Sequence, residues 1–163
     1  KGRAFLRFDY SGHGQSSGAF TDGTIGAWAA DALAIIDQVT DGDLILVGSS
    51  MGGWIGLLAA LARPDRVKGY IGLAAAPDFT KELEEGNDHL LLGATIPLTC
   101  PVRLIQGQQD PDVPWRTAQR ISDRLTSTDV VITYVKSGDH RLSTDADLKR
   151  LCQQVKEISG ELT

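Results

Sequence analysis

Hydrophobic and polar positions along this chain fall into two alternating kinds of segment. Short, mostly apolar runs predict strands at 4–8, 44–47, 67–73, 102–105 and 130–135. Longer segments with apolar residues at helical spacing predict helices at 24–39, 53–62, 115–125 and 145–158. The helix over 53–62 is almost wholly apolar, so we expect it to be buried beneath a sheet.

Strands that alternate with helices predict an α/β fold, in which a mostly parallel β-sheet is flanked by helices on both faces. No internal repeat or low-complexity segment interrupts this pattern, so we expect a single domain over 1–163. Active sites of such sheets lie at the carboxyl ends of the strands. Each catalytic residue should therefore stand in a loop just after a strand.

Composition narrows the classes of function. A chain of 163 residues with 42% hydrophobic residues can bury a core, and no apolar run is long enough for a membrane span. The net charge of −5 argues against nucleic acid as a partner. Cys100 and Cys152 form no Cys-x-x-Cys pair, so we expect buried thiols rather than a disulfide or a metal site. The start at Lys1 suggests a cut or processed chain without a signal peptide, and we expect a cytoplasmic location.

The run Gly48-Ser49-Ser50-Met51-Gly52 stands between a predicted strand and a predicted helix. Gly-x-Ser-x-Gly in that context is typical of a tight turn that lifts a strained serine above the sheet. We expect both glycines to be required, because side chains at those two positions would collide with neighbouring backbone. Ser50 is therefore the candidate nucleophile, which needs a base, an acid and an oxyanion hole.

The three histidines differ in their positions relative to the predicted strands. His140 follows the last strand, His13 follows the first, and His89 lies in a charged stretch with no strand before it. The base must come after the strand of Ser50 and reach its hydroxyl, so His140 fits best. An exposed loop histidine is the alternative for His140. His13 is expected to brace its own loop, because no second metal ligand is spaced to accompany it.

The candidate acid follows the strand at 102–105. Asp110 is closest to the end of that strand, and Asp112 is its competitor. An aspartate before proline also suits a simple turn, which is the alternative for either residue. A turn alone does not explain why Ser50, Asp110 and His140 follow three different strands in that order.

This order is that of the α/β-hydrolase superfamily, and further motifs resemble it over nearly the whole chain. They are the loop Asp9-x-x-Gly12-x-Gly14-x-Ser16, the nucleophile turn with Gly53 after it, Gly107-x-x-Asp110-x-x-Val113-Pro114, and Gly138-Asp139-His140. The residues that occupy these motifs are similar to those of a bacterial branch related to the mitochondrial palmitoyl-protein thioesterase and acyl-glucuronide hydrolase.

Two departures from the family pattern matter for chemistry. The family has three strands before the Asp9 loop, and the loop after the third supplies one oxyanion amide. Here only the Met51 amide carries over, so the chain needs a substitute donor or should be a poor catalyst. The candidates for that donor are an amide or hydroxyl of the loop 10–12 and a group from another chain. The lid region, 77–101, is short. Without this central strand, either the strand at 4–8 lies next to the strand at 44–47 or an edge of the sheet is exposed. An open edge invites pairing with another chain, so we expect a homodimer or swapped assembly.

We therefore predict a serine esterase or thioesterase that cleaves small acyl ester or thioester substrates without a cofactor or metal. The resemblance implies Ser50 as nucleophile, His140 as base, Asp110 as acid and the Met51 amide as oxyanion donor. Trp54, Trp115 and Tyr10 are candidate substrate contacts, although both tryptophans equally suit core packing. A peptidase is a lesser variant. A catalytically impaired binding or scaffold module with the same fold is the alternative, because the oxyanion hole is incomplete.

Overall fold

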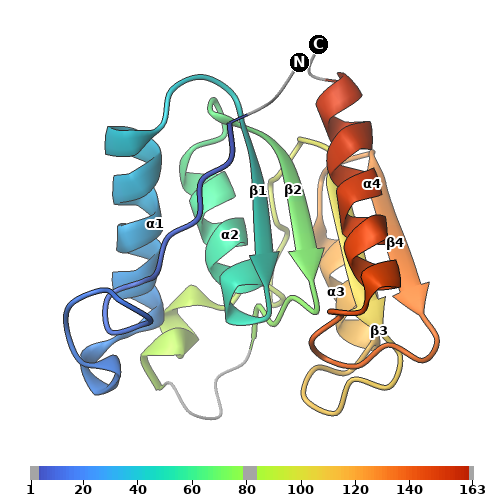
Figure 1. Cartoon of the computed structure of the whole chain (residues 1–163), viewed down its shortest axis with the longest axis horizontal. Helices are drawn as coiled ribbons and strands as arrows, with labels where there is room; N and C mark the ends of the chain where they lie inside the picture. The colour runs from blue at the N-terminus through green and yellow to red at the C-terminus, as the bar shows by residue number, and fades with distance from the viewer. Residues whose placement is uncertain (1–3, 79–83, 162–163) are drawn as a thin grey trace.

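The chain folds around a four-stranded parallel sheet (Figure 1). The computed structural model describes residues 4–78 and 84–161. The strands pair in chain order, and they are β1 (Leu44–Ser49), β2 (Val67–Leu73), β3 (Val102–Gly107) and β4 (Val130–Val135). All three pairings are parallel, so the four carboxyl ends meet at one end of the sheet.

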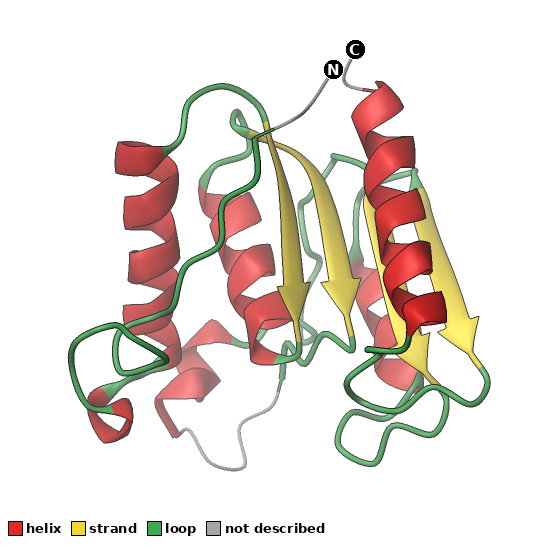
Figure 2. Cartoon of the chain, in the orientation of Figure 1, coloured by secondary structure: helices red, strands yellow, loops and turns green. Residues whose placement is uncertain are grey.

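Helices cover both faces of this sheet (Figure 2). The helical elements are η1 (Phe20–Asp22), α1 (Ile25–Val39), α2 (Met51–Ala62), η2 (Glu84–His89), α3 (Arg116–Arg124) and α4 (Asp145–Glu161). Helices α2 and α3 lie on one face, α4 lies on the other, and α1 packs on the outer side of α2. The predicted architecture, a parallel sheet flanked by helices on both faces, is confirmed.

The apolar sequence of α2 follows from its place between two layers. Trp54, Ile55 and Ala59 pack with the buried face of α1. Leu57 and Ala60 pack with the side chains of β2 and β3. A helix that is buried on both sides has no face in water that requires polar residues. The two faces of α2 are therefore similarly apolar. No helix of the described chain is both long enough and apolar enough to cross a bilayer.

The prediction of a strand at 4–8 is wrong. Residues 4–10 form no regular structure and run past α1 and α2 in Figure 1. Phe5 is 84% exposed, and Leu6 and Phe8 are exposed as well. A strand needs a neighbour for its backbone N–H and C=O groups. Within the described residues no strand lies beside this segment, so its apolar pattern alone cannot make it one.

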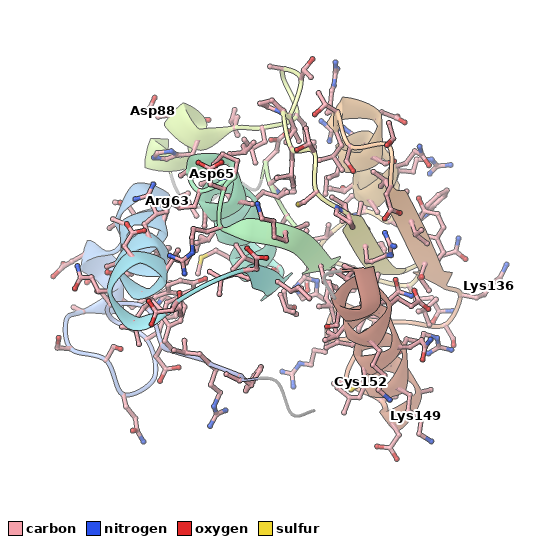
Figure 3. All side chains as sticks on the ribbon, turned by 90° about the horizontal axis from the view of Figure 1, so that it is seen from above. Arg63, Asp65, Asp88, Lys136, Lys149 and Cys152 are labelled. Carbon is pink, nitrogen blue, oxygen red and sulfur yellow. The ribbon has the colours of Figure 1, made fainter. Side chains whose placement is uncertain are left out.

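One edge of β1 is open. Strand β2 pairs along one side of β1, and in the described ranges no strand pairs along the other. Val47 on β1 is 46% exposed. Seen from above, the segment 4–10 and α4 stand on either side of a space in front of β1 (Figure 3).

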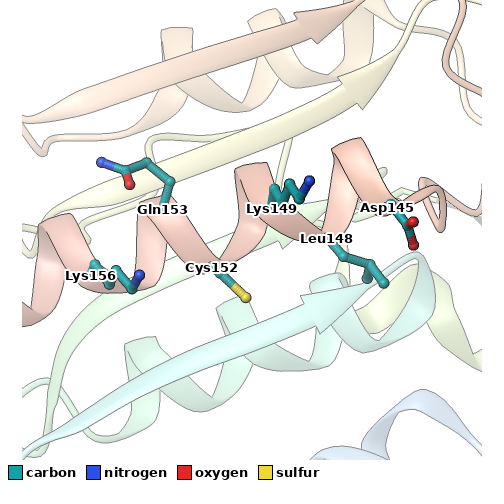
Figure 4. Close-up of a pocket in the computed structure, with 6 residues that line it drawn as sticks. All are labelled: Asp145, Leu148, Lys149, Cys152, Gln153 and Lys156. Carbon is teal, nitrogen blue, oxygen red and sulfur yellow. The ribbon is translucent and has the colours of Figure 1, made fainter.

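Helix α4 also has an exposed side that carries an apolar residue and a cysteine. Leu148 is 49% exposed, and the exposed Cys152 lies one turn further along the helix. Both belong to a shallow hollow whose lining comes from α4 alone (Figure 4), from Asp145, Leu148, Lys149, Cys152, Gln153 and Lys156. The expectation of two buried cysteines is therefore wrong for Cys152, whereas Cys100 is half-buried.

The open edge of β1 generates a testable prediction about assembly. If a second chain pairs with β1, Val47→Lys should weaken the dimer, because like charges on facing strands cost up to about 1 kcal/mol, or roughly fivefold in affinity. Light scattering after size exclusion, over a dilution series, measures this. Val131→Lys on β4 is the matched control, because Val131 is 44% exposed on the strand at the other edge. A chain that stays monomeric at every concentration would contradict the expected assembly.

Candidate active site

The turn between β1 and α2 holds Ser50 in a strained conformation. Its φ of 52° and ψ of −119° lie outside the regions that L-residues usually occupy. Backbone hydrogen bonds enforce this geometry, because the Ser50 amide donates to Leu73 O at 2.9 Å and its carbonyl accepts from Gly53 N at 2.9 Å. The Ser50 carbonyl also accepts from Ala76 N at 3.3 Å. The serine therefore stands where β1 ends and α2 begins, tied to the loop after β2.

The glycines of this turn are not equally crowded. A Cβ on Gly48 would lie 2.2 Å from the carbonyl oxygen of Gly52, and one on Gly53 would lie 2.7 Å from the Cβ of Ala75. A Cβ on Gly52 would meet only the Tyr10 hydroxyl, at an ordinary 3.8 Å. The expectation that both Gly48 and Gly52 avoid collisions is therefore wrong for Gly52. The second crowded position is Gly53, where α2 passes close to the loop after β2.

His140 lies between Ser50 and Asp110. Its Nε2 is 3.1 Å from Ser50 Oγ, and its Nδ1 is 2.9 Å from Asp110 Oδ2. The three residues come from loops after β4, β1 and β3, all at the carboxyl end of the sheet. The structure thus brings together the three side chains that the sequence analysis placed in separate loops. With Nδ1–H donating to the carboxylate, Nε2 is left to accept a proton from the serine.

Asp110 is held as a carboxylate by several donors. Its side chain is fully buried, and burial by itself would raise its pKa. The amides of Val113 and Asp112, at 2.9 and 2.8 Å from Oδ1, together with His140, outweigh that effect and hold the pKa of Asp110 below its ordinary value. The exposed Asp112 thus supports Asp110 through its backbone.

Gln106 is a residue that sequence reasoning missed. It is 1% exposed near the end of β3, and its side-chain amide is 3.1 Å from Asp110 Oδ2 and 3.3 Å from the Val113 carbonyl. Its place near the end of β3, four residues before the acid, is its only mark in the sequence, and Arg103 on β3 and Gln108 after it are polar as well. Its side chain orients the carboxylate that in turn orients His140.

Asp110, Asp112 and His140 are also close enough to share a cation, since their ligand atoms lie within 4.8 Å of one another. However, His140 Nδ1 and the Asp110 carboxylate are already joined to each other, and the opposite ring nitrogen reaches Ser50. These contacts favour a proton relay over a metal site.

Two of the predicted substrate contacts are tryptophans with partners of their own. Trp54 is 1% exposed in the core between α1 and α2, and its indole N–H donates to His89 O at 2.9 Å. Trp115 is half-buried against Tyr134, with a ring-centroid distance of 5.4 Å. Both tryptophans thus occupy packing positions, which was the alternative for each.

Tyr10 lies behind the nucleophile turn. Its hydroxyl would lie 3.8 Å from a Cβ on Gly52, and burial, followed by the charge of Asp31, raises the pKa of Tyr10. The neighbouring Tyr70 is fully buried and donates to Gly53 O at 2.8 Å. The two phenols therefore support the first turn of α2 from inside the protein.

The Met51 amide is available as the predicted oxyanion donor, and part of the loop expected to supply a second donor is engaged elsewhere. The Met51 amide is the first of α2, and the first amides of a helix have no partner within it. The Ser11 amide donates to Asp31 Oδ2 at 2.8 Å, and the Gly12 amide donates to Ser17 O at 2.9 Å. The expectation that Ser11 or Gly12 offers an amide is therefore wrong.

The short lid region contributes the six-residue 3₁₀ helix η2 and the segment after it. Residues 81–83 of the predicted lid, which include the charged Lys81 and Glu82, lie outside the described residues. Leu92 is 4% exposed in the core, and Leu91 packs against the same core, whereas Leu90 is 44% exposed. Of these three leucines, Leu90 is the exposed one.

The crowding at Gly48 predicts a difference between two glycine-to-alanine changes. Gly48→Ala should lower the free energy of unfolding by about 1–3 kcal/mol, because its methyl group would meet the Gly52 carbonyl. Gly52→Ala is the matched control and should be neutral or slightly stabilising, since alanine favours the helix and the site is open. Urea unfolding measures both. Equal losses in the two variants would contradict the observed packing of the turn.

The lowered pKa of Asp110 predicts how stability changes with pH. A folded-state pKa below the ordinary value of 3.8 means that the carboxylate stabilises the fold above that pH and that this contribution disappears as pH falls through the folded pKa. Between pH of about 5 and 2, the wild type should lose more stability than Asp110→Asn. Urea unfolding across this range measures the slopes, and equal slopes would contradict the assignment.

The sequence of this chain is similar to those of known proteins. Residues 1–94 match the α/β hydrolase fold family. The chain is 38% identical over 199 aligned positions to the mitochondrial palmitoyl-protein thioesterases ABHD10 of Mus musculus and Homo sapiens. It covers 67% and 65% of their lengths, respectively, so it spans about two thirds of these relatives. Because the alignment is longer than the 163 residues of this chain, the relatives carry residues inside the matched region that this chain lacks.

The fold of this chain is also similar to those of solved structures. Mouse α/β hydrolase domain-containing protein 10 superposes with a TM-score of 0.90 at 36% identity, over 96% of this chain and 78% of that one. A putative hydrolase from Agrobacterium vitis S4 superposes with a TM-score of 0.88 at 36% identity, over 93% and 75%. From its sequence and its fold, the chain belongs to the α/β hydrolase fold family.

Proposed function

We propose that this chain is a serine hydrolase that cleaves carboxylic ester or thioester bonds through an acyl-enzyme on Ser50. The observation that carries the proposal is the unbroken series of contacts from Asp110 through His140 to the hydroxyl of Ser50. A hydroxyl is a poor nucleophile at neutral pH, and a hydrogen-bonded imidazole is the usual group that activates it.

In the proposed reaction, Ser50 Oγ attacks the acyl carbon while His140 Nε2 takes its proton. Asp110 keeps the imidazole oriented and stabilises the imidazolium that forms. The Met51 amide donates to the oxyanion of the tetrahedral intermediate. When the intermediate collapses, His140 returns the proton to the leaving alcohol or thiol. Water activated by the same base then attacks the acyl-enzyme and restores Ser50.

Fatty-acyl thioesters are the substrates that we propose first. The relatives at 37–38% identity are named palmitoyl-protein thioesterases, which are enzymes of acyl thioesters. The same triad chemistry accepts oxygen esters, because the acyl carbon and the steps at Ser50 are the same in both. It requires no cofactor, since every proton transfer uses His140.

The incomplete oxyanion hole favours a second candidate, a binding or scaffold module with little turnover. Within the described residues, the amides of Ser11 and Gly12 are already bonded, which leaves Met51 as the identified donor. Loss of one donor typically costs about 2.7–4 kcal/mol of transition-state stabilisation. This candidate predicts ligand binding that survives Ser50→Ala.

The two candidates make opposite predictions for Ser50. For the hydrolase, a fluorophosphonate should label Ser50, and Ser50→Ala should abolish labelling and lower kcat by about 10⁶-fold. Mass spectrometry of the labelled peptide and a panel of p-nitrophenyl esters and acyl thioesters measure these effects. Folded wild-type protein that is neither labelled nor active would rule out the hydrolase and favour the binding module.

The acid loop offers a matched pair of variants. Asp110→Asn should lower kcat by up to about 10⁴-fold, because a neutral amide no longer stabilises the imidazolium. Asp112→Asn should retain most of the activity, because it is the backbone amide of Asp112 that contacts Asp110. Equal losses in the two variants would contradict the assignment of Asp110 as the acid.

A further inference from the structure

The loop after β2 is built against the nucleophile turn. Ala74 adopts a positive φ of 44° and donates its amide to Ile105 O at 2.9 Å. Ala75 packs against Gly53, and the Ala76 amide donates to the carbonyl of Ser50 at 3.3 Å. These residues are buried, so the loop leaves the sheet in one defined direction beside Ser50.

Asp78 stands at the end of this buried loop and joins it to the segment 89–92. Its Oδ1 accepts the amides of Leu91 and Leu92, at 3.3 and 3.2 Å. Its Oδ2 is 3.5 Å from Nη2 of Arg120 on α3. Backbone amides outside helices and strands need another acceptor when water is excluded, and one carboxylate here serves two of them.

A second attachment comes from α2. The Trp54 indole N–H donates to His89 O at 2.9 Å, and Trp54 lies one turn after Ser50 on the same helix. Leu91 packs against the core that contains Trp54. The segment 89–92 is thus tied to α2 and to the loop after β2, both of which contact the nucleophile turn. Figure 1 places η2 near the start of α2, at the carboxyl end of the sheet.

One apolar side chain of the segment 89–92 remains exposed. Leu92 is buried and Leu91 is partly buried, whereas Leu90 is 44% exposed between them and His89. A segment that is held at both ends and presents a leucine suits contact with an apolar chain rather than with a charged ligand. Each methylene that such a surface buries contributes up to about fourfold in kcat/KM.

We propose that Asp78 is a positioning residue that holds 89–92 as a wall of the acyl site, so that Leu90 contacts the acyl chain and sets the preference for its length. This inference rests on the proposed hydrolase activity. Asp78 acts through the backbone of Leu91 and Leu92 and touches neither the substrate nor the triad.

The test compares p-nitrophenyl acetate with p-nitrophenyl octanoate. Asp78→Ala should lower the octanoate-to-acetate ratio of kcat/KM by about tenfold, mainly through a higher KM for octanoate. Asp78→Asn should restore most of the wild-type ratio, because its amide oxygen can accept the same two amides. Asp65→Ala is the matched control, since Asp65 is exposed just before β2, at the opposite end of the sheet (Figure 3).

A second variant covers the case in which Asp78→Ala does not fold. Leu90→Ala should also lower the octanoate-to-acetate ratio, since it removes the proposed contact without touching the attachments. Unchanged ratios in both Asp78→Ala and Leu90→Ala, or in Leu90→Ala alone if the other is unfolded, would overturn the inference. An Asp78→Asn ratio as low as that of Asp78→Ala would also overturn it. Wild type that neither turns over nor labels at Ser50 would instead end the proposed function.

Discussion

The site depends on the backbone turn at Ser50. A residue with φ of 52° persists only where its surroundings impose that conformation, and here its amide is bonded to β2 and its carbonyl to the loop that follows β2. Gly48 lets the turn close, because nothing larger fits beside the Gly52 carbonyl. The hydroxyl is therefore positioned by the sheet, and the other functional groups need only reach it.

Those other groups are arranged in successive layers behind the hydroxyl. His140 is the only one of them in contact with Ser50, Asp110 contacts His140, and Gln106 with two backbone amides contacts Asp110. Exposure falls along this series, from a His140 side chain 24% exposed to a fully buried Asp110 side chain. A charged group at the buried end is tolerated because several donors surround it, and its fixed position in turn selects the tautomer of the imidazole.

The parts of the molecule that sequence reasoning recovered are those that depend on local pattern. The strand–turn–helix around Ser50 and the loops of Asp110 and His140 could be located because turn glycines and strand ends mark them. Residues 4–8 were misjudged because a strand requires a partner, and pairing is not a local property. Gln106 was missed since nothing in a single strand tells which polar side chain will face a buried carboxylate, and Trp54 looked like a ligand contact until the packing of α1 enclosed it.

The order of the strands has a consequence for how the protein is made. Because β1 to β4 pair in the order of synthesis, each strand finds its neighbour as soon as that neighbour has left the ribosome, and long-range searches are few. The nucleophile turn can thus assemble early, whereas its imidazole comes from the loop after β4. In a nascent chain, Ser50 would therefore stand in its final turn before the side chains of Asp110 and His140 reach it.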